Sequence, residues 1–182
     1  MSPKPPFIRL SLATLLLGAA VASLPAWAET RQVPFKASVV TQEIINPFAP
    51  DLTRCPGSGL VGTTTGQGTA SHMGSVTLLA TDCPLTHDGV NFFFSNGRLT
   101  LTAANGDKLT ASYSGSLLPV PGASPPVHAI NGTFSVTGGS GRFAGARGGG
   151  SLQGSEDIVT LKGRYEVKGM LSFEHEKKSD KD

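Results

Sequence analysis

The fold is decided by the stretch Leu99-Thr100-Leu101-Thr102-Ala103-Ala104-Asn105-Gly106-Asp107-Lys108-Leu109-Thr110-Ala111-Ser112-Tyr113. Apolar and polar residues alternate on both sides of Asn105-Gly106, with the period of a half-buried β-strand. Asn-Gly is typical of a type I′ turn, because both central residues of that turn need a positive φ. The stretch therefore predicts a β-hairpin.

The same alternation predicts further strands along the chain. They lie near residues 33–41, 59–70, 73–80, 127–137, 143–154 and 158–173. With the hairpin, this makes about eight strands. A second Asn-Gly pair, Asn96-Gly97, either closes another hairpin after Phe92-Phe93-Phe94 or marks a bulge in one long strand. Both interpretations stay open.

The last predicted strand has one apolar face and one charged face. The apolar face holds Val159, Leu161, Gly163, Tyr165, Val167, Gly169, Leu171 and Phe173, and the other holds Thr160, Lys162, Arg164, Glu166 and Lys168. About eight antiparallel strands of this kind predict an all-β fold, a small closed barrel with a filled interior. Gly163 and Gly169 suit the bends that closing a barrel requires. A β-sandwich is the alternative.

The first 28 residues have the pattern of a cleaved secretion signal. Lys4 and Arg9 precede an apolar run over 10–24, and Ala26-Trp27-Ala28 offers a cleavage site. The run is too short to cross a bilayer, so we expect an exported protein, periplasmic or secreted, without a membrane anchor after cleavage. Residues 29–174 then form a single barrel domain with loops at 46–56 and 118–126 (Pro-rich), and 175–182 form a charged disordered tail.

The composition of residues 29–182 argues against several functions. They carry 13 basic and 13 acidic side chains, so nucleic-acid binding is not expected. Cys55 and Cys83 are expected to pair in an oxidising compartment. No metal and no cofactor is expected, because the histidines have no ligand-like spacing; they are His72, His87, His128 and His175.

A glycine-rich motif resembles a known family. Residues 137–148 read Thr-Gly-Gly-Ser-Gly-Arg-Phe-Ala-Gly-Ala-Arg-Gly, which is similar to the corresponding stretch of plant allene oxide cyclases and, more loosely, of dirigent proteins. Both families are small eight-stranded antiparallel barrels. A looser pattern, which includes residues 68–74 and 102–107, resembles exported bacterial proteins of this class that mostly lack an assigned function.

The resemblance implies a ligand or substrate inside the barrel, but it carries over no catalytic residue. Residues 33–41 and 59–70 contain no counterpart of the polar cluster of allene oxide cyclases, and the acidic cavity residues of dirigent proteins have no matching position. We therefore expect a non-enzymatic module, either structural or binding a small apolar or phenolic ligand. The alternative is an isomerase or cyclase acting on a small apolar substrate. Monomer and homotrimer both stay open.

Alternation places four polar side chains on apolar faces, where they are candidates for ligand contacts inside the barrel. They are His72, Tyr113, His128 and Tyr165. The alternative is that each lies at a strand end, with its polar tip in water. Glu156 and Asp157 are not expected to act as a carboxylate pair, because neighbouring residues of a strand point to opposite faces.

Overall fold

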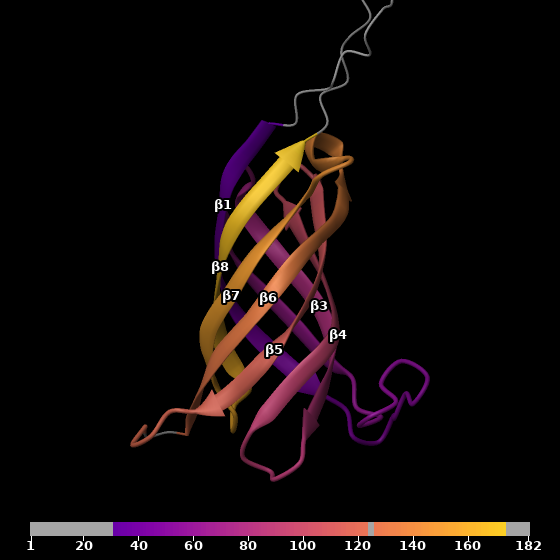
Figure 1. Ribbon diagram of the computed structural model, residues 1–182, viewed down its shortest axis with the longest axis vertical. Coiled ribbons are helices and arrows are strands. Elements are labelled where there is room, and N and C mark those ends of the chain that lie inside the picture. The colour runs from indigo at the N-terminus through magenta and orange to yellow at the C-terminus, as the bar shows by residue number, and fades with distance from the viewer. Residues whose placement is uncertain (1–30, 124–125, 174–182) are drawn as a thin grey trace, which may run out of the picture.

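The chain folds into a closed barrel of eight antiparallel strands (Figure 1). The computed structural model describes residues 31–123 and 126–173, so the predicted secretion signal and charged tail lie outside the described residues. The strands are β1 (Arg31–Ile45), β2 (Gly62–Ala70), β3 (Gly74–Thr86), β4 (Phe92–Ala103), β5 (Lys108–Pro119), β6 (Val127–Ser140), β7 (Arg147–Asp157) and β8 (Lys162–Phe173).

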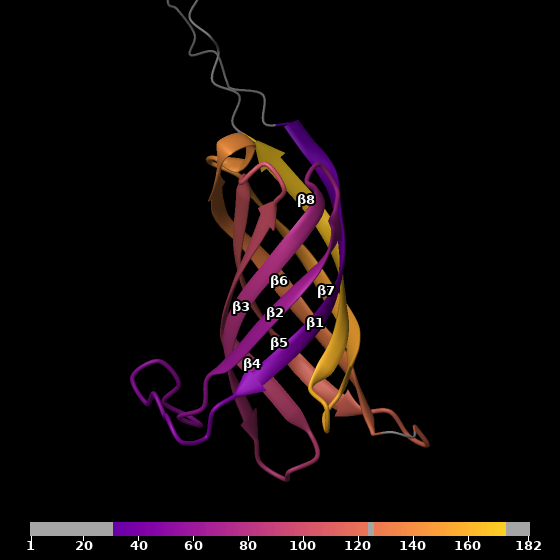
Figure 2. The same ribbon diagram turned by 180° about the vertical axis from the view of Figure 1, so that it is seen from behind.

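The barrel closes because each strand pairs with the next one along the chain and β8 pairs with β1. Figure 2 shows the closing side, where β1 lies beside β2 on one edge and β8 on the other. The predicted all-β barrel is confirmed, and the sandwich alternative is wrong. No helix within residues 31–123 and 126–173 has the length and apolar character needed to span a bilayer.

Several strands run further than the sequence analysis predicted, β1, β3 and β7 among them. β1 continues to Ile45, β3 to Thr86 and β7 to Asp157, whereas the predicted ends were residues 41, 80 and 154. In contrast, β8 begins late. Leu161 has a φ of 55° and closes a turn by donating its N–H to the Asp157 carbonyl at 2.7 Å. Val159 is consequently 73% exposed, and its predicted place on the apolar face is wrong.

The Asn105-Gly106 pair lies in the hairpin between β4 and β5, as predicted, but the turn is not type I′. Gly106 has a φ of 87°, whereas Asn105 is not among the residues with positive φ. The Ala103 carbonyl accepts a hydrogen bond from the Gly106 N–H at 2.9 Å, and the Ala103 N–H donates to the Asp107 carbonyl at 2.9 Å. This is a type I turn followed by a glycine bulge, which needs positive φ only at the glycine.

The Asn96-Gly97 pair lies inside β4 and forms the bulge rather than a second hairpin. Asn96 has a φ of 51°, and the register between β4 and β5 shifts between Phe94 and Gly97. The shift leaves Phe94 buried, while Phe93 is 45% exposed.

The two ends of the barrel differ. One end, here called the short-turn end, carries the β2–β3 and β4–β5 turns and the short 3-10 helix η1 (Gly141–Phe143) (Figure 1). The fully buried side chains of Phe143, Ala146 and Leu171 fill it. The opposite end, called the long-loop end, carries residues 46–61, 87–91, 120–123 and 158–161. Any cavity accessible to ligands is therefore expected at the long-loop end.

The barrel interior changes from apolar to polar toward the long-loop end. Along β1, the inward side chains of Phe35, Ala37 and Val39 are buried in the core, and Thr41 and Glu43 follow on the same face. Phe35 packs against Phe134 of β6, with ring centroids 6.3 Å apart. The apolar half supplies the core, and the polar half is the place to look for a site.

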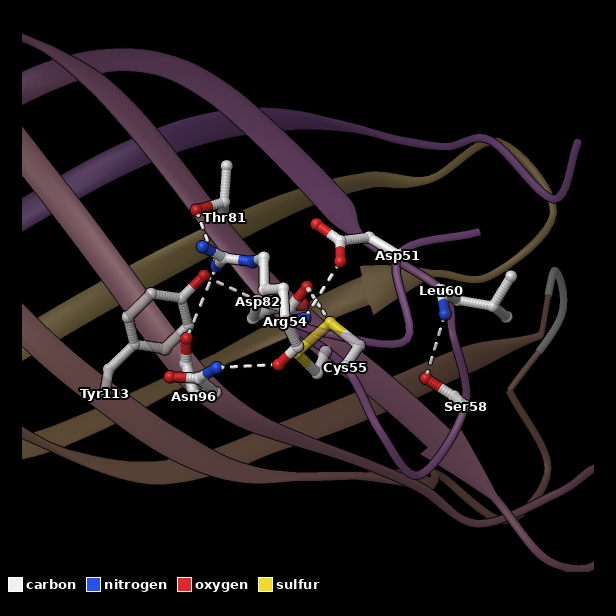
Figure 3. The surroundings of a disulfide bond; sticks show 10 residues. Asp51, Arg54, Cys55, Ser58, Leu60, Thr81, Asp82, Asn96 and Tyr113 are labelled. Carbon is white, nitrogen blue, oxygen red and sulfur yellow. Dashed lines mark hydrogen bonds between the residues drawn. A yellow bond between two sulfur atoms is a disulfide. The ribbon is translucent and has the colours of Figure 1, made fainter. Parts of the chain in front are cut away.

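The predicted disulfide between Cys55 and Cys83 is present and fastens the long loop 46–61 to β3 (Figure 3). Beside it, Arg54 Nη2 donates a hydrogen bond to Thr81 Oγ1 at 2.8 Å. Asn96 Nδ2, from the β4 bulge, donates to the Arg54 carbonyl at 2.9 Å. The loop is thereby held against the outer face of β3 and β4.

Reducing the disulfide is expected to lower the free energy of unfolding by about 3 kcal/mol, because the open chain gains conformational freedom in the unfolded state. Urea denaturation with and without a phosphine reductant measures this difference. The double variant Cys55→Ala/Cys83→Ala should match the reduced protein and should not respond to the reductant. Equal stability of the oxidised and reduced protein would contradict the structural role of the bond.

Candidate functional site: an acidic cavity at the long-loop end

The candidate site is a cavity of about 200 Å³ inside the long-loop end of the barrel, here called the acidic cavity. Its apolar lining includes Ile45, Phe92, Phe94, Leu117, Leu152 and Ile158. Five polar side chains complete it: Glu43, Asp82, Tyr113, Glu156 and Tyr165. A concave apolar surface with a few convergent polar groups is the usual composition of a small-molecule site.

The barrel geometry explains why these polar residues meet. Strands β1, β3, β5 and β7 all run toward the long-loop end, and each contributes one inward polar side chain there; they are Glu43, Asp82, Tyr113 and Glu156. Inward residues of alternate strands lie at similar levels in small barrels. Tyr165 enters from the beginning of β8, the strand that starts at this end.

Two tyrosines donate hydrogen bonds to two of the carboxyl groups. The Tyr113 hydroxyl lies 2.7 Å from Asp82 Oδ2, and the Tyr165 hydroxyl lies 3.3 Å from Glu156 Oε2. Asp82 is 7% exposed, and its other oxygen, Oδ1, is buried with no hydrogen-bond partner. Buried polar atoms are normally paired, so this oxygen is an acceptor available to a ligand.

Gly62 of β2 makes room for two of the carboxyl groups. A Cβ at this position would collide with Glu43 Oε1 and lie 2.9 Å from Asp82 Oδ1. Both oxygens therefore face the glycine from neighbouring strands. Any larger residue would push them apart or out of the cavity.

Burial raises the pKa of all three carboxyl groups. The pKa of Glu43 rises to about 8, first through burial and then through the charges of Asp82 and Glu156. The pKa of Asp82 rises to about 6, where burial outweighs the Tyr113 hydrogen bond and the charge of Arg54. Burial also raises the pKa of Glu156. At neutral pH, Asp82 is therefore mostly ionised and Glu43 mostly protonated.

Burial also raises the pKa of Tyr113 and Tyr165, with help from the neighbouring carboxylates. Both phenols consequently stay protonated and act as hydrogen-bond donors. Both rings also line a second, deeper cavity of about 40 Å³ whose walls are almost entirely apolar. The polar groups therefore form a layer between the apolar core and the apolar rim of the acidic cavity.

The structure brings together two of the four predicted site residues. Tyr113 and Tyr165 line the acidic cavity, and their contact with a ligand stays a prediction. His72 is exposed in the β2–β3 turn at the opposite end, with Nε2 3.0 Å from the Pro34 carbonyl, so its predicted inward place is wrong. His128 is buried, but its Nε2 lies 2.9 Å from the Val90 carbonyl, its ring packs against Phe92, and it does not line the acidic cavity.

Sequence reasoning missed the three carboxyl groups. Glu43, Asp82 and Glu156 all lie beyond the predicted strand ends at 41, 80 and 154, although each continues the inward alternation of its strand. One further step of the same alternation would have found them. Asp157 does point away from Glu156, since its Oδ1 accepts the Val159 N–H at 2.8 Å in the next turn. The partners of Glu156 come from other strands instead.

The polar groups of the cavity offer hydrogen bonds rather than a set of metal ligands. In residues 31–123 and 126–173, no three His, Cys, Asp or Glu side chains converge closely enough to hold a metal. The arrangement can accept hydrogen bonds through carboxylates and donate them through phenols and a protonated carboxyl group.

Raising the pH from about 5 to about 8 is expected to destabilise the protein by roughly 5 kcal/mol. The folded pKa values of Glu43 and Asp82 lie above those of the unfolded chain, so the folded state binds more protons in this window and stability falls as protons are lost. Urea denaturation at several pH values measures the slope.

Glu43→Gln should flatten this pH dependence, because the variant has no proton to lose at that position. Glu166→Gln, on the exposed outer face of β8, is the matched control and should keep the wild-type slope. A wild-type stability that rises between pH 5 and pH 8 would contradict the raised pKa values.

Comparison with known proteins shows the fold. No family model matches the chain, and no curated protein matches its sequence. Among solved structures, the barrel is similar to that of a pterocarpan synthase dirigent protein, with a TM-score of 0.50 and 13% sequence identity. The match covers 88% of this chain and 99% of that one. The chain therefore has a dirigent-like barrel fold.

Proposed function

We propose that the protein is an exported binding module that takes one small, mostly apolar molecule with a polar group into the acidic cavity. The observation that carries this proposal is the cavity itself, with aromatic and aliphatic walls and five polar side chains from five strands. Its volume of about 200 Å³ is below the ~300–1,000 Å³ of sites for drug-sized ligands. The ligand is accordingly a small one.

The polar layer specifies a ligand with a hydrogen-bonding group. Asp82 Oδ1 has no partner within the protein, and a buried acceptor without a partner costs about 1–3 kcal/mol. A ligand donor would remove this cost. Phe92, Phe94 and Leu117 offer apolar contacts to the rest of the molecule.

Export is supported by the secretion-signal pattern of residues 1–28 and by the disulfide. Disulfides persist in oxidising compartments and are rare in the cytosol. The proposed location is the periplasm or the outside of the cell, and the dirigent-like fold accords with the exported bacterial proteins that the sequence resembles.

A second candidate function is an isomerase or cyclase that works by proton transfer. One observation favours it: Glu43, with a pKa of about 8, and Asp82, with a pKa of about 6, face the same cavity. Two carboxyl groups whose pKa values differ can serve as acid and base. The Tyr113 hydroxyl would steady the Asp82 carboxylate in that role.

Native mass spectrometry of the protein purified from its producing cells is expected to show an added mass that is lost on denaturation. Leu117→Trp should abolish this added mass, because the larger side chain fills the cavity. Leu79→Trp is the control, since Leu79 is 56% exposed on the outer face of β3. Wild-type protein without any added mass, or an added mass that survives in Leu117→Trp, would contradict the proposed site.

Mature protein is expected to begin at Glu29, because the cleavage pattern ends at Ala28. Intact mass measurement of protein from the culture medium and the periplasmic fraction checks both the cleavage and the compartment. Full-length protein confined to the cytosol would overturn the proposal of export.

A further inference from the structure

We propose that the polar group of the ligand is a protonated amine, so that the acidic cavity takes a small arylalkyl- or alkylammonium ion. This inference rests on the proposed binding function and names the chemical class of the ligand. Three features of the cavity carry it: the sign of its charges, its free hydrogen-bond acceptors and its aromatic walls.

The charged groups of the cavity are all acidic. Carboxyl groups enter from β1, β3 and β7, and none of the described residues that line the cavity is Lys, Arg or His. Arg54 lies on the outer side of the wall, where it donates to Thr81 Oγ1 (Figure 3). Thr81 and Asp82 are neighbours in β3 and point to opposite faces. A cationic ligand therefore meets the ionised Asp82 carboxylate beside two further acidic groups, and no competing cation is among the described residues that line the cavity.

The free hydrogen-bond capacity at Asp82 is that of an acceptor. Asp82 is more than nine-tenths buried, and its Oδ1 has no partner while Oδ2 accepts from Tyr113. Glu43 Oε1 faces the same glycine, Gly62, as Asp82 Oδ1. An ammonium group has three N–H donors and no acceptor, which matches these oxygens. An alcohol brings one donor, and a carboxylate ligand brings no donor and adds a fourth acidic group.

The walls offer aromatic surface for the same kind of ligand. Phe92, Phe94, Tyr113 and Tyr165 all line the cavity, and the Phe94 and Tyr113 ring centroids lie 5.7 Å apart. Aromatic rings attract cations through their π-electrons and also bury hydrocarbon. A bare metal ion has no hydrocarbon to bury against these walls. In the described part of the chain, the acidic groups also do not converge closely enough to bind one.

The decisive experiment compares the affinities of three probes that share one carbon skeleton, measured by isothermal titration calorimetry at pH 7.5. The probes are 2-phenylethylamine, 2-phenylethanol and phenylacetate. The amine is expected to bind at least about tenfold more tightly than the alcohol, in line with a charge-assisted hydrogen bond. Phenylacetate is expected to show no measurable binding. At pH 5 the amine is still protonated but Asp82 and Glu43 are mostly protonated too, so its advantage should fall about tenfold.

Amine binding should also release protons at pH 7.5, because the ammonium ion favours ionised Glu43. The measured heat will then depend on the ionisation enthalpy of the buffer for the amine and not for the alcohol. Asp82→Asn and, independently, Glu43→Gln should bring the ratio of amine to alcohol affinity toward one. Glu166→Gln, on the outer face, is the matched control and should keep the wild-type ratio.

The outcomes separate this inference from the function on which it rests. Equal affinity for the amine and the alcohol, or tighter binding of phenylacetate, overturns the ammonium assignment and leaves the cavity a binding site. An amine preference that survives in Asp82→Asn and Glu43→Gln also overturns it. Binding of none of the three probes contradicts both proposals.

Discussion

Three carboxyl groups are enclosed at one end of a closed barrel. The structure at that end depends on offsetting the energetic cost of burying them. Moving an ionised carboxylate out of water is costly unless it is protonated, paired or hydrogen-bonded. The barrel uses protonation and hydrogen bonding. Glu43 holds its proton to a higher pH, Asp82 accepts from Tyr113, and Glu156 accepts from Tyr165. Asp82 Oδ1 keeps no hydrogen-bond partner within the described part of the protein, and the proposed ligand donor would supply one.

The rest of the molecule holds this cluster in place. Phe143 and Leu171 fill the short-turn end, so the cavity is confined to the long-loop end. Gly62 leaves the space that Glu43 and Asp82 occupy. The disulfide fastens the loop that carries Arg54 to the outside of β3, and from there the guanidinium partly offsets the cost of an ionised Asp82. The core at the short-turn end, Gly62 and the disulfide therefore all help to hold the three carboxyl groups in their positions.

Alternation was sufficient to predict the fold but not to find the site. It predicted the barrel, the hairpin at Asn105-Gly106 and the inward face of Tyr113 and Tyr165. The alternation failed to identify inward positions occupied by polar residues. Glu43 and Asp82 interrupt the apolar pattern, so the predicted strands ended before them, although both strands continue and both side chains point inward. His72 shows the opposite error, since a residue in phase with an apolar face lies in an exposed turn. Which side chains meet across the barrel depends on register between strands, and single-strand patterns do not contain that information.

The protonation states of the three carboxyl groups are open to direct measurement by carbon-detected NMR, in which the side-chain carboxyl carbons of Glu43, Asp82 and Glu156 are followed from pH 3 to pH 9. The buried cluster predicts that all three titrate above the ordinary carboxyl range, with Asp82 near 6 and Glu43 near 8. Exposed Glu166 provides the internal reference in the same spectra. Ordinary titration of all three near pH 4 would mean that water reaches these groups freely, and the enclosed acidic cavity would be contradicted.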